Sequence, residues 1–436
     1  MQAVKVGLLG LGTVGGGTAT VLLRNADEIQ RRVGRAIEIS HVAGLGIASQ
    51  TIVDPAKVKL TEDAFEVVND PEVQIVVELI GGYTLAKELV LRAIENGKHV
   101  VTANKALIAT HGPEIMKAAM AKGVSVCYEA AVAGGIPIIK AVREGLAANR
   151  IQWIAGIING TGNFILTEMR DKGRDFDDVL KEAQQLGYAE ADPTFDVEGI
   201  DAAHKLTILA SLAFGIELQF DKCYTEGISK ITTDDVNFAG QLGYRIKHLG
   251  ITRKTENGIE LRVHPTLIPE KRLIANVDGV MNAVLVYGDA VGPTLYYGAG
   301  AGAEPTASAV VADIIDTVRA IDCAAQQKVP LLGFRPDAMS SMPVLPMEDT
   351  QTAYYLRICA QDKPGVLARI SNIFATHDIS IEAVLQKEPA EGQSMVSLIL
   401  LTQKVQERNM NNSIAEIEAL NSTQGEVVRI RMEHLK

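Results

Sequence analysis

Between Gly187 and Lys205 the sequence gathers acidic and basic side chains beside an apolar run, Leu206 to Phe214, that has the composition of a buried segment. The charged residues are Glu190, Asp192, Asp196, Glu198, Asp201 and Lys205. Carboxylates can bind an ammonium group, and a lysine at such a position can transfer a proton. We therefore expect a polar site at the end of a core helix.

The helix that would present this site is predicted to start at Gly199 or Ile200, because apolar residues recur from there at helical spacing. Pro193 keeps the preceding loop out of the helix. Asp201 and Lys205 are four residues apart, so they lie one turn apart on one face. Taken alone, such a pair is more often an exposed ion pair worth about 0.3–0.5 kcal/mol.

A second site is predicted at the N-terminus. The apolar strand Val4 to Leu9 runs into Gly10-Leu11-Gly12-Thr13-Val14-Gly15, and a helix-like segment, Thr18 to Arg24, follows. This order is typical of a dinucleotide site, in which the glycines admit the pyrophosphate and the helix N-terminus binds it. A glycine-rich turn without a ligand is the less favoured interpretation.

Strands and helices alternate up to residue 128, which predicts a doubly wound parallel sheet with ligands at the carboxyl ends of its strands. Two loops are expected there, Glu78 to Gly82 and Thr102 to Lys105, and Lys105 would point into the crevice. The next helix is expected over Pro113 to Ala121.

The residue that selects the cofactor is missing from its usual position. An NAD site has an acid after the second strand and an NADP site an arginine, but Gly44-Leu45-Gly46 stands there. Lys57 or Lys59 could reach a 2′-phosphate, so the preference between NAD and NADP stays open.

Four parts are predicted along the chain. Residues 1–135 with about 304–325 form a Rossmann-type nucleotide-binding domain, and 136–303 an inserted α+β catalytic and dimerisation domain. A linker, 326–350, with proline and methionine leads to 351–436. The last part has the order βαββαβ of a ferredoxin-like unit.

Composition and charge exclude several classes of function. The chain has 436 residues and a net charge of −11, which argues against a nucleic-acid surface. No apolar run reaches the roughly 18 residues of a membrane span, and no signal region begins the chain, so we expect a cytoplasmic protein. The four cysteines are scattered, as buried free thiols would be.

Several motifs together resemble homoserine dehydrogenase: Gly10 to Gly15, Thr102 to Lys105, Gly156 to Leu166 and Gly187 to Lys205. The segment Asp362 to Leu367 resembles the start of an ACT domain, a module that senses amino acids. The resemblance covers nearly the whole chain in the expected order. Two departures are Gly162, where many relatives carry threonine, and the missing arginine after the second strand.

The resemblance implies reversible hydride transfer between NADH or NADPH and aspartate 4-semialdehyde, which gives homoserine. It implies Lys205 and Lys105 as catalytic residues. We favour Lys205 as general acid in the reducing direction, because there it only needs to be a cation that donates to the carbonyl oxygen, and Lys105 would help by charge and position. The implied substrate-binding residues are Glu190, Asp196, Asp201, Thr161 and Asn163. The implied cofactor-binding residues are Gly10, Gly12, Thr13, Val14, Gly15, Lys105 and Gly302.

The resemblance also implies a sodium or potassium ion, a threonine effector and a homodimer or homotetramer. The cation would bind Glu129, Val132, Gly134 and Ile136, mostly through carbonyl oxygens, although a solvated Gly-Gly turn is nearly as plausible. Threonine would bind at Asp362 and Gly365, between paired ACT units. A structural dimerisation tail is the alternative, and deleting residues after Thr350 is expected to keep activity but remove threonine sensitivity.

Two other functions stay open at this point. One is another NAD(P)-dependent oxidoreductase of an amino or hydroxy acid, possibly a semialdehyde dehydrogenase, but no cysteine has an activating base beside it in sequence. The other is a non-catalytic amino-acid sensor, which would need neither Lys105 nor Lys205.

Overall fold

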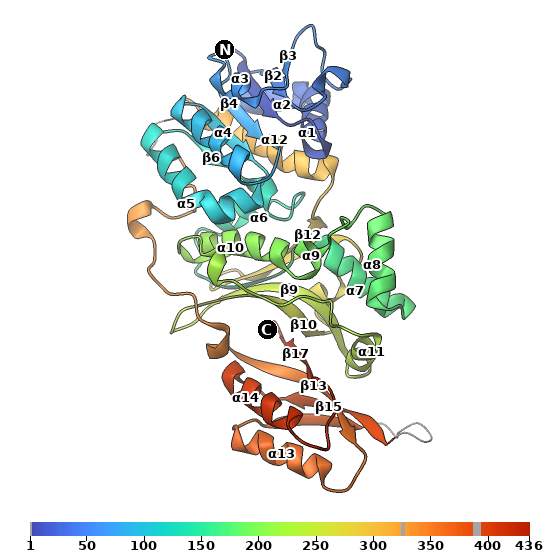
Figure 1. Cartoon of the computed structure of the whole chain (residues 1–436). Coiled ribbons are helices and arrows are strands. Elements are labelled where there is room, and N and C mark those ends of the chain that lie inside the picture. Colours follow the sequence, from blue (N-terminus) through green and yellow to red (C-terminus); the bar gives the residue numbers. More distant parts are fainter. Residues whose placement is uncertain (1, 324–327, 387–393) are drawn as a thin grey trace. The chain divides into compact units, whose positions relative to one another are not determined.

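The computed structural model describes residues 2–323, 328–386 and 394–436 (Figure 1). The chain forms two units. The first comprises Met1–Gly160, Asp201–Cys223 and Val280–Met342, and the second comprises Thr161–Ile200, Tyr224–Gly279 and Pro343–Lys436. Among the described residues, every helix is too short or too polar to cross a membrane.

The first unit is built on a six-stranded parallel sheet of order β3-β2-β1-β4-β5-β6. Its strands are β1 (Val4–Leu9), β2 (Ile37–Ala43), β3 (Lys59–Thr61), β4 (Ile75–Glu78), β5 (His99–Thr102) and β6 (Val126–Cys127). They are apolar along most of their length because helices cover both faces. This order confirms the predicted doubly wound sheet.

Helices from distant parts of the chain pack on this sheet. On one side α1 (Thr13–Arg24) lies beside α12 (Ala303–Ala320), as Figure 1 shows in blue and orange. The contact is close because a Cβ on Gly17 would lie 2.5 Å from the Ala303 carbonyl oxygen. The helices α4 (Thr84–Glu95) and α5 (Lys105–Lys122) pack against each other.

One helix starts earlier than predicted. The segment expected as a loop followed by a helix over Pro113–Ala121 is one helix, α5, from Lys105 onward. Pro113 lies inside it and only removes one backbone donor from the ladder. Lys105 is therefore fixed on the first turn of a helix and not on a flexible loop.

The first unit also holds three antiparallel strands and a buried helix. The strands β7 (Ile151–Ile157), β11 (Met281–Gly288) and β12 (Gly292–Ala299) have the order β12-β11-β7. The helix α10 (Ile200–Phe214) begins at the predicted residue, after Gly199, whose φ of 83° suits glycine. Nearly all of its residues are buried, which explains why apolar side chains occupy it.

The second unit combines helices and a sheet. Its helices before the sheet are α7 (Gly160–Lys172), α8 (Phe176–Gln185), α9 (Thr194–Val197) and α11 (Thr233–Gln241). The long hairpin β9 (Tyr244–Lys254) and β10 (Ile259–Pro269) is antiparallel, and the two-residue strand β8 (Tyr224–Thr225) pairs with β10.

The C-terminal part of the second unit has the predicted βαββαβ order. Its elements are β13 (Gln351–Gln361), α13 (Val366–Thr376), β14 (Ile381–Gln386), β15 (Met395–Thr402), α14 (Glu407–Glu418) and β17 (Val428–Met432), with a two-residue strand β16 (Val405–Gln406). Figure 1 shows α13 and α14 side by side on this sheet.

This module shares a core with the rest of its unit. Along β13, Tyr354 packs in a core with Phe374 of α13, whereas Tyr355 packs in a different core with Leu267 of β10. The alternation follows from the period of two in a strand. Because β17 also pairs with β10, a deletion after Thr350 would expose that core. We now expect it to unfold the unit instead of leaving an active enzyme.

A buried ion cluster joins β10 to the C-terminal end of the chain. The carboxylate of Glu433 accepts hydrogen bonds from Arg262 at 2.6 Å and from Arg253 at 3.0 Å. Burial would raise the pKa of Glu433, but the two arginine charges outweigh burial and hold that pKa at about 2. The charged form is therefore the one that stabilises the fold.

A Glu433→Gln variant is expected to lose roughly 3 kcal/mol of unfolding free energy at pH 7. A lowered folded-state pKa gives stability that is complete above the unfolded-state pKa and disappears as pH falls towards 2. The difference in unfolding free energy between the unaltered protein and Glu433→Gln, measured by urea unfolding, should therefore shrink from pH 7 to pH 3. An equal difference at both pH values would contradict the assignment, and exposed Glu348→Gln is the matched control.

Candidate active site

Three charged side chains meet at the start of α10. Asp201 is 3% exposed, and its two carboxylate oxygens contact two different ammonium groups. Lys105 Nζ lies 2.8 Å from Oδ1, and Lys205 Nζ lies 2.7 Å from Oδ2. The predicted pair of Asp201 and Lys205 is thus buried and extended by Lys105, in contrast to the exposed pair that helical spacing alone suggested.

The strand β7 and the residues after it anchor this group. Lys205 Nζ donates to the carbonyl oxygen of Ile158 at 2.7 Å, and Asn159 Nδ2 donates to Asp201 Oδ2 at 2.9 Å. The side chain of Lys205 is 12% exposed and that of Lys105 is 34% exposed. Lys205 is therefore held in a defined position by two oxygen atoms.

Lys105 is positioned by polar bonds at the ends of β4 and β5. Glu78 is fully buried and accepts hydrogen bonds from the backbone of Ile80 and Gly81 and from Thr102 Oγ1 at 2.6 Å. Asn104 in turn caps α5 through Leu107 N at 3.0 Å. The sequence indicated both loops, but not that the Glu78 carboxylate joins them.

The charge state of Asp201 follows from its neighbours. Burial would raise the pKa of Asp201, but the charges of Lys205 and Lys105 and their hydrogen bonds outweigh burial and hold that pKa well below its usual value. Asp201 is therefore a carboxylate at neutral pH and cannot donate a proton there. The two ammonium groups are the acids of this cluster.

His204 was not singled out from the sequence, although it lies between Asp201 and Lys205 in the chain. It is 1% exposed and its ring stacks on Phe220, with 4.0 Å between the ring centres. Burial lowers the pKa of His204 to about 4. The imidazole is therefore neutral at pH 7 and adds no charge to the cluster.

The turn between β1 and α1 has the geometry of a phosphate-binding loop. Gly10 has φ 94°, and a Cβ on Gly15 would lie 2.1 Å from the Gly10 carbonyl oxygen. Gly12 precedes α1, and a Cβ there would have no atom within 4 Å, so this side of the turn is open. Thr13 and Val14 begin the helix, whose first turn contains no acidic side chain that would repel an anion.

Gly302 lies at the start of α12, the helix that packs beside α1. Its φ of 129° is one that other residues rarely adopt, and a Cβ there would approach Pro305 to 3.3 Å. Gly302 thus shapes the chain entering α12, and the first residue of α12, Ala303, packs against Gly17 of α1.

A carboxylate does lie near the end of β2. Glu62 Oε1 accepts a hydrogen bond from Gly46 N at 3.1 Å, although Glu62 follows β3 in the chain. Lys59 Nζ instead pairs with the Asp70 carboxylate at 3.0 Å. In the pairing of β2 with β3, Lys59 lies opposite His41, two residues before the end of β2. The search for an acid directly after the second strand therefore missed Glu62. This residue follows β3, and the pairing of β3 with β2 places its carboxylate beside Gly46.

Thr161 and Asn163 lie on α7 in the second unit and are both buried. Thr161 Oγ1 donates to the carbonyl oxygen of Tyr188 at 2.5 Å. Asn163 donates to the carbonyl oxygens of Val277 and Gly279 and accepts from Lys247 Nζ at 3.1 Å. Both residues thus support the loops around them.

Glu190 and Asp196 belong to the segment between α8 and α10. Glu190 is exposed, and its carbonyl oxygen accepts from Gln184 Nε2 at 3.1 Å. Asp196 is half-buried in α9, which starts directly after Pro193. The first unit brings together Lys105, Lys205 and Asp201, whereas these two carboxylates belong to the second unit.

The loop with Glu129, Val132, Gly134 and Ile136 is buried except at Gly135. The Glu129 carboxylate accepts from the backbone N–H groups of Ile139 and Lys140, both at 2.8 Å, and the Ile136 carbonyl accepts from Ile138 N at 2.7 Å. Within the described ranges, no cluster of three His, Cys, Asp or Glu residues could hold a metal. A cation here would rely on backbone oxygens.

Asp362 and Gly365 form the turn between β13 and α13. Asp362 is exposed, and its Oδ1 accepts from Gln386 Nε2 at 3.1 Å. Gly365 has φ 89° and open space where a Cβ would be. An exposed turn at a helix start can offer backbone N–H groups to a carboxylate.

Three family models match the chain. The family model for homoserine dehydrogenase matches residues 137–315, and the model for the NAD binding domain of homoserine dehydrogenase matches residues 10–129. The ACT domain model matches residues 354–418. The three matches follow one another along the chain without overlap.

Individual relatives match over the full length. A homoserine dehydrogenase from Pseudomonas aeruginosa is 66% identical over 435 residues, and one from Neisseria gonorrhoeae is 57% identical; both alignments cover 100% of each chain. The solved structure of a homoserine dehydrogenase from Thiobacillus denitrificans is 64% identical, has a TM-score of 0.95 and covers 100% of this chain and 99% of its own.

Proposed function

The chain belongs to the homoserine dehydrogenase family, and from this membership we propose that Lys205 is its general acid. The chain is an NAD(P)-dependent oxidoreductase that acts on a CH–OH group and serves amino-acid biosynthesis. The observation that supports the proposal is the position of Lys205 Nζ, 2.7 Å from both Asp201 and the Ile158 carbonyl oxygen.

In the reducing direction aspartate 4-semialdehyde becomes homoserine. When bound, the nicotinamide cofactor supplies the hydrogen and two electrons that reach the aldehyde carbon. The carbonyl oxygen then needs one proton, which we assign to the Lys205 ammonium. In the reverse direction the neutral amine takes the proton of the alcohol.

Asp201 and Lys105 assist without donating the proton. The carboxylate of Asp201 stays ionised, so it orients both lysines and balances their charges. Lys105, more exposed and bound to the other carboxylate oxygen, adds positive charge where negative charge develops on the substrate oxygen. The alternative of a non-catalytic sensor is disfavoured, because a sensor needs neither lysine.

The substrate's charged groups define the remaining roles. Its ammonium group needs carboxylates, and we assign this role to Glu190 with help from Asp196. Thr161 and Asn163 shape the substrate-binding loops through their hydrogen bonds within the second unit. The open side of the turn from Gly10 to Gly15 fits a pyrophosphate and supports cofactor binding there.

Cofactor preference is proposed to depend on Glu62. Its carboxylate beside Gly46 can bind ribose hydroxyls but would repel a 2′-phosphate. We therefore expect NADH to be favoured, and Glu62→Gln to raise kcat/KM for NADPH relative to NADH by about tenfold. Initial rates of NADH and NADPH oxidation with aspartate 4-semialdehyde measure this ratio.

The matched control is Glu66→Gln, a change at a nearby residue of α3 (Ala64–Asn69), which should leave the ratio unchanged. If Glu62→Gln leaves the ratio of kcat/KM for NADPH and NADH unaltered, Glu62 does not contact the cofactor. Absence of turnover with either nucleotide, in a folded protein that binds both, would instead refute the proposed use of aspartate 4-semialdehyde.

A sodium or potassium ion is proposed at the loop of Glu129, Val132, Gly134 and Ile136. Carbonyl oxygens suit such hard cations, and the Glu129 carboxylate nearby adds negative charge. Activity should then rise when potassium or sodium replaces tetramethylammonium at constant ionic strength. Equal activity in all three salts would contradict the proposal.

Threonine is proposed as the effector of the ACT domain, bound at the turn of Asp362 and Gly365. The carboxylate can bind the threonine ammonium, and the backbone at Gly365 its carboxylate. An Asp362→Asn variant should need about tenfold more threonine for half-maximal inhibition. If threonine inhibits Asp362→Asn and the unaltered protein equally, the effector binds elsewhere. If threonine does not inhibit the unaltered protein, the ACT module is better explained as a structural dimerisation tail.

The enzyme is further proposed to be a homodimer or homotetramer. The edge strand β12 supports this, because it is the last strand at one end of its sheet and carries Tyr297, which is 59% exposed. Light scattering during size-exclusion chromatography would give the mass, and a monomer would contradict the proposal.

A further inference from the structure

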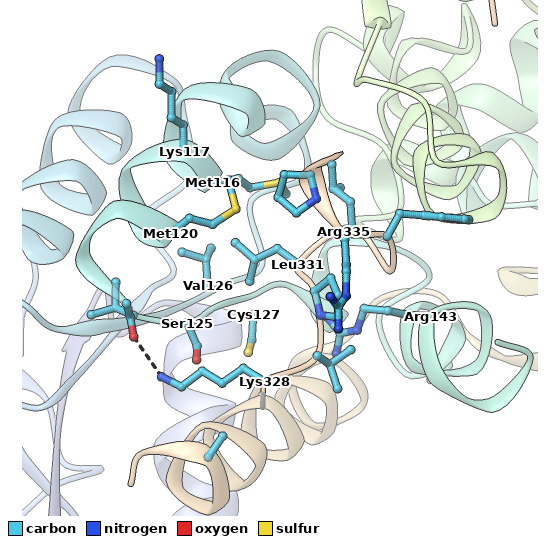
Figure 2. A pocket seen from close by; sticks show the side chains of 18 of the residues that line it. Met116, Lys117, Met120, Ser125, Val126, Cys127, Arg143, Lys328, Leu331 and Arg335 are labelled. Atoms are coloured by element: carbon cyan, nitrogen blue, oxygen red, sulfur yellow. Dashed lines mark hydrogen bonds between the residues drawn. The ribbon is translucent and has the colours of Figure 1, made fainter. Parts of the chain in front are cut away.

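The first unit contains a large cavity that plays no part in the proposed reaction. Its volume is about 780 Å³, within the range of sites for small molecules. The C-terminal half of α5, the C-terminal end of α12 and the segment 328–339 line it. Figure 2 shows Met116, Met120 and Val126 on one side and Arg143 and Arg335 on the other.

The cavity is separate from the lysine cluster. Lys105 starts α5, and Met116 and Met120 lie 11 and 15 residues further along the same helix. At 1.5 Å per residue these side chains are roughly 17 and 22 Å from Lys105 along the helix axis. A molecule in the cavity would therefore not compete directly for the proposed catalytic lysines.

Specific bonds hold the wall formed by segment 328–339. Lys328 Nζ donates to the Gly123 carbonyl oxygen at 3.0 Å, which Figure 2 marks with a dashed line. Tyr128 Oη donates to the Leu331 carbonyl oxygen at 2.5 Å, and Ser340 N donates to the Gly215 carbonyl oxygen at 2.6 Å. The wall is thus tied to three separate parts of the unit.

A buried cation lines the cavity. The side chain of Arg143 is only 8% exposed, and its Nε and Nη2 both bond to Glu144 Oε1, at 3.2 and 2.7 Å. Within the described ranges Nη1 of Arg143 has no acceptor. A guanidinium can bind a carboxylate through two parallel N–H groups, so Arg143 keeps the capacity for a second acceptor.

The other charges of the lining leave a positive excess. Asp316 is paired with Lys140 and Arg319. Among the described residues no carboxylate pairs with the remaining lining cations, and two lining carboxylates have no cationic partner. The unpaired cations are Lys117, Lys328 and Arg335, and the unpaired carboxylates are Glu217 and Asp337.

We propose that this cavity binds a small molecule with an apolar body and one carboxylate. Met116, Met120, Val126 and Leu331 would enclose the apolar body, and Arg143 with Arg335 would bind the carboxylate. An apolar site with a few placed polar groups is typical of small-molecule binding. Burial of an anion requires a cationic partner, which Arg143 supplies.

The test uses three probes that share a phenyl ring and a four-carbon chain: 4-phenylbutyrate, 4-phenylbutan-1-ol and 4-phenylbutylamine. Binding to the full chain is followed through the NMR signals of the methionine methyl groups, assigned by Met116→Leu and Met120→Leu. The carboxylate is expected to shift the Met116 and Met120 signals and to bind at least about tenfold more tightly than the alcohol or the amine.

Two variants test the anion site. Arg335→Gln, an exposed change that should not affect folding, and Arg143→Gln are each expected to weaken 4-phenylbutyrate about tenfold. Arg150→Gln, at an exposed arginine outside the cavity, should leave the affinity unchanged. Circular dichroism shows whether each variant folds. If Arg143→Gln does not fold, the affinity of Arg335→Gln for 4-phenylbutyrate tests the anion site by itself.

Three results would overturn the proposal. Equal binding of the alcohol and the carboxylate would show an apolar hole without an anion site. Shifts at other methionines, such as Met281, without shifts at Met116 and Met120 would place the probe elsewhere. Absence of binding at millimolar 4-phenylbutyrate would show that the cavity does not accept this class of molecule.

Discussion

A Lys205→Ala variant is expected to lower kcat about a thousandfold or more while leaving the dissociation constant for NADH within about twofold. The ammonium group supplies the proton for the substrate oxygen, and alanine cannot replace it. Steady-state rates with aspartate 4-semialdehyde give kcat, and fluorescence titration of NADH gives the dissociation constant.

Lys222→Ala is the matched control, because Lys222 is an exposed lysine of the same unit that bonds only to Gln219 in the described structure. This variant should retain the activity of the unaltered enzyme. Turnover of Lys205→Ala within about tenfold of that enzyme would instead assign proton transfer to Lys105.

An Asp201→Asn variant is expected to lose both activity and stability. Removing the carboxylate leaves two ammonium groups beside one neutral side chain in a buried site, which we expect to destabilise the fold by about 3 kcal/mol. The lysines also lose their common anchor, so kcat should fall about a hundredfold. Urea unfolding and steady-state rates measure the two effects.

A second substitution separates these effects. In Asp201→Asn with Lys105→Met one of the two ammonium groups is gone, so part of the lost stability should return. Activity should stay low, because Asp201 no longer holds Lys205. Because the pKa of Asp201 is held well below its usual value, the stability loss should be the same at pH 6 and pH 8. An Asp201→Asn protein as stable as the unaltered one would contradict the buried cluster.

Local patterns in the sequence predicted the elements that present the chemistry. The glycines between Gly10 and Gly15 predicted the nucleotide-binding turn, because a tight turn and a close approach of the backbone to a ligand need residues without a Cβ. The four-residue spacing of Asp201 and Lys205 placed both on one face of α10. The alternation of strands and helices, and the order βαββαβ, were sufficient for the fold class.

Contacts between distant residues could not be predicted in this way. The bond from Glu62 to Gly46 depends on β3 pairing with β2, and the role of Glu78 depends on β4 pairing with β5. The embedding of the ACT module depends on β17 pairing with β10. Each contact requires the register of a sheet, which one sequence does not specify. The sequence likewise placed Lys105 on a loop and the next helix at Pro113, whereas the helix α5 begins at Lys105.

Chemical rescue tests the central claim, proton donation by Lys205, most directly. Rates of NADH oxidation by Lys205→Ala and Lys105→Ala are measured with aspartate 4-semialdehyde and increasing methylammonium at constant ionic strength. We predict that methylammonium restores part of the rate in Lys205→Ala, because the small cation can donate the missing proton, and has much less effect in Lys105→Ala. Rescue of Lys105→Ala alone would contradict the account and make Lys105 the acid.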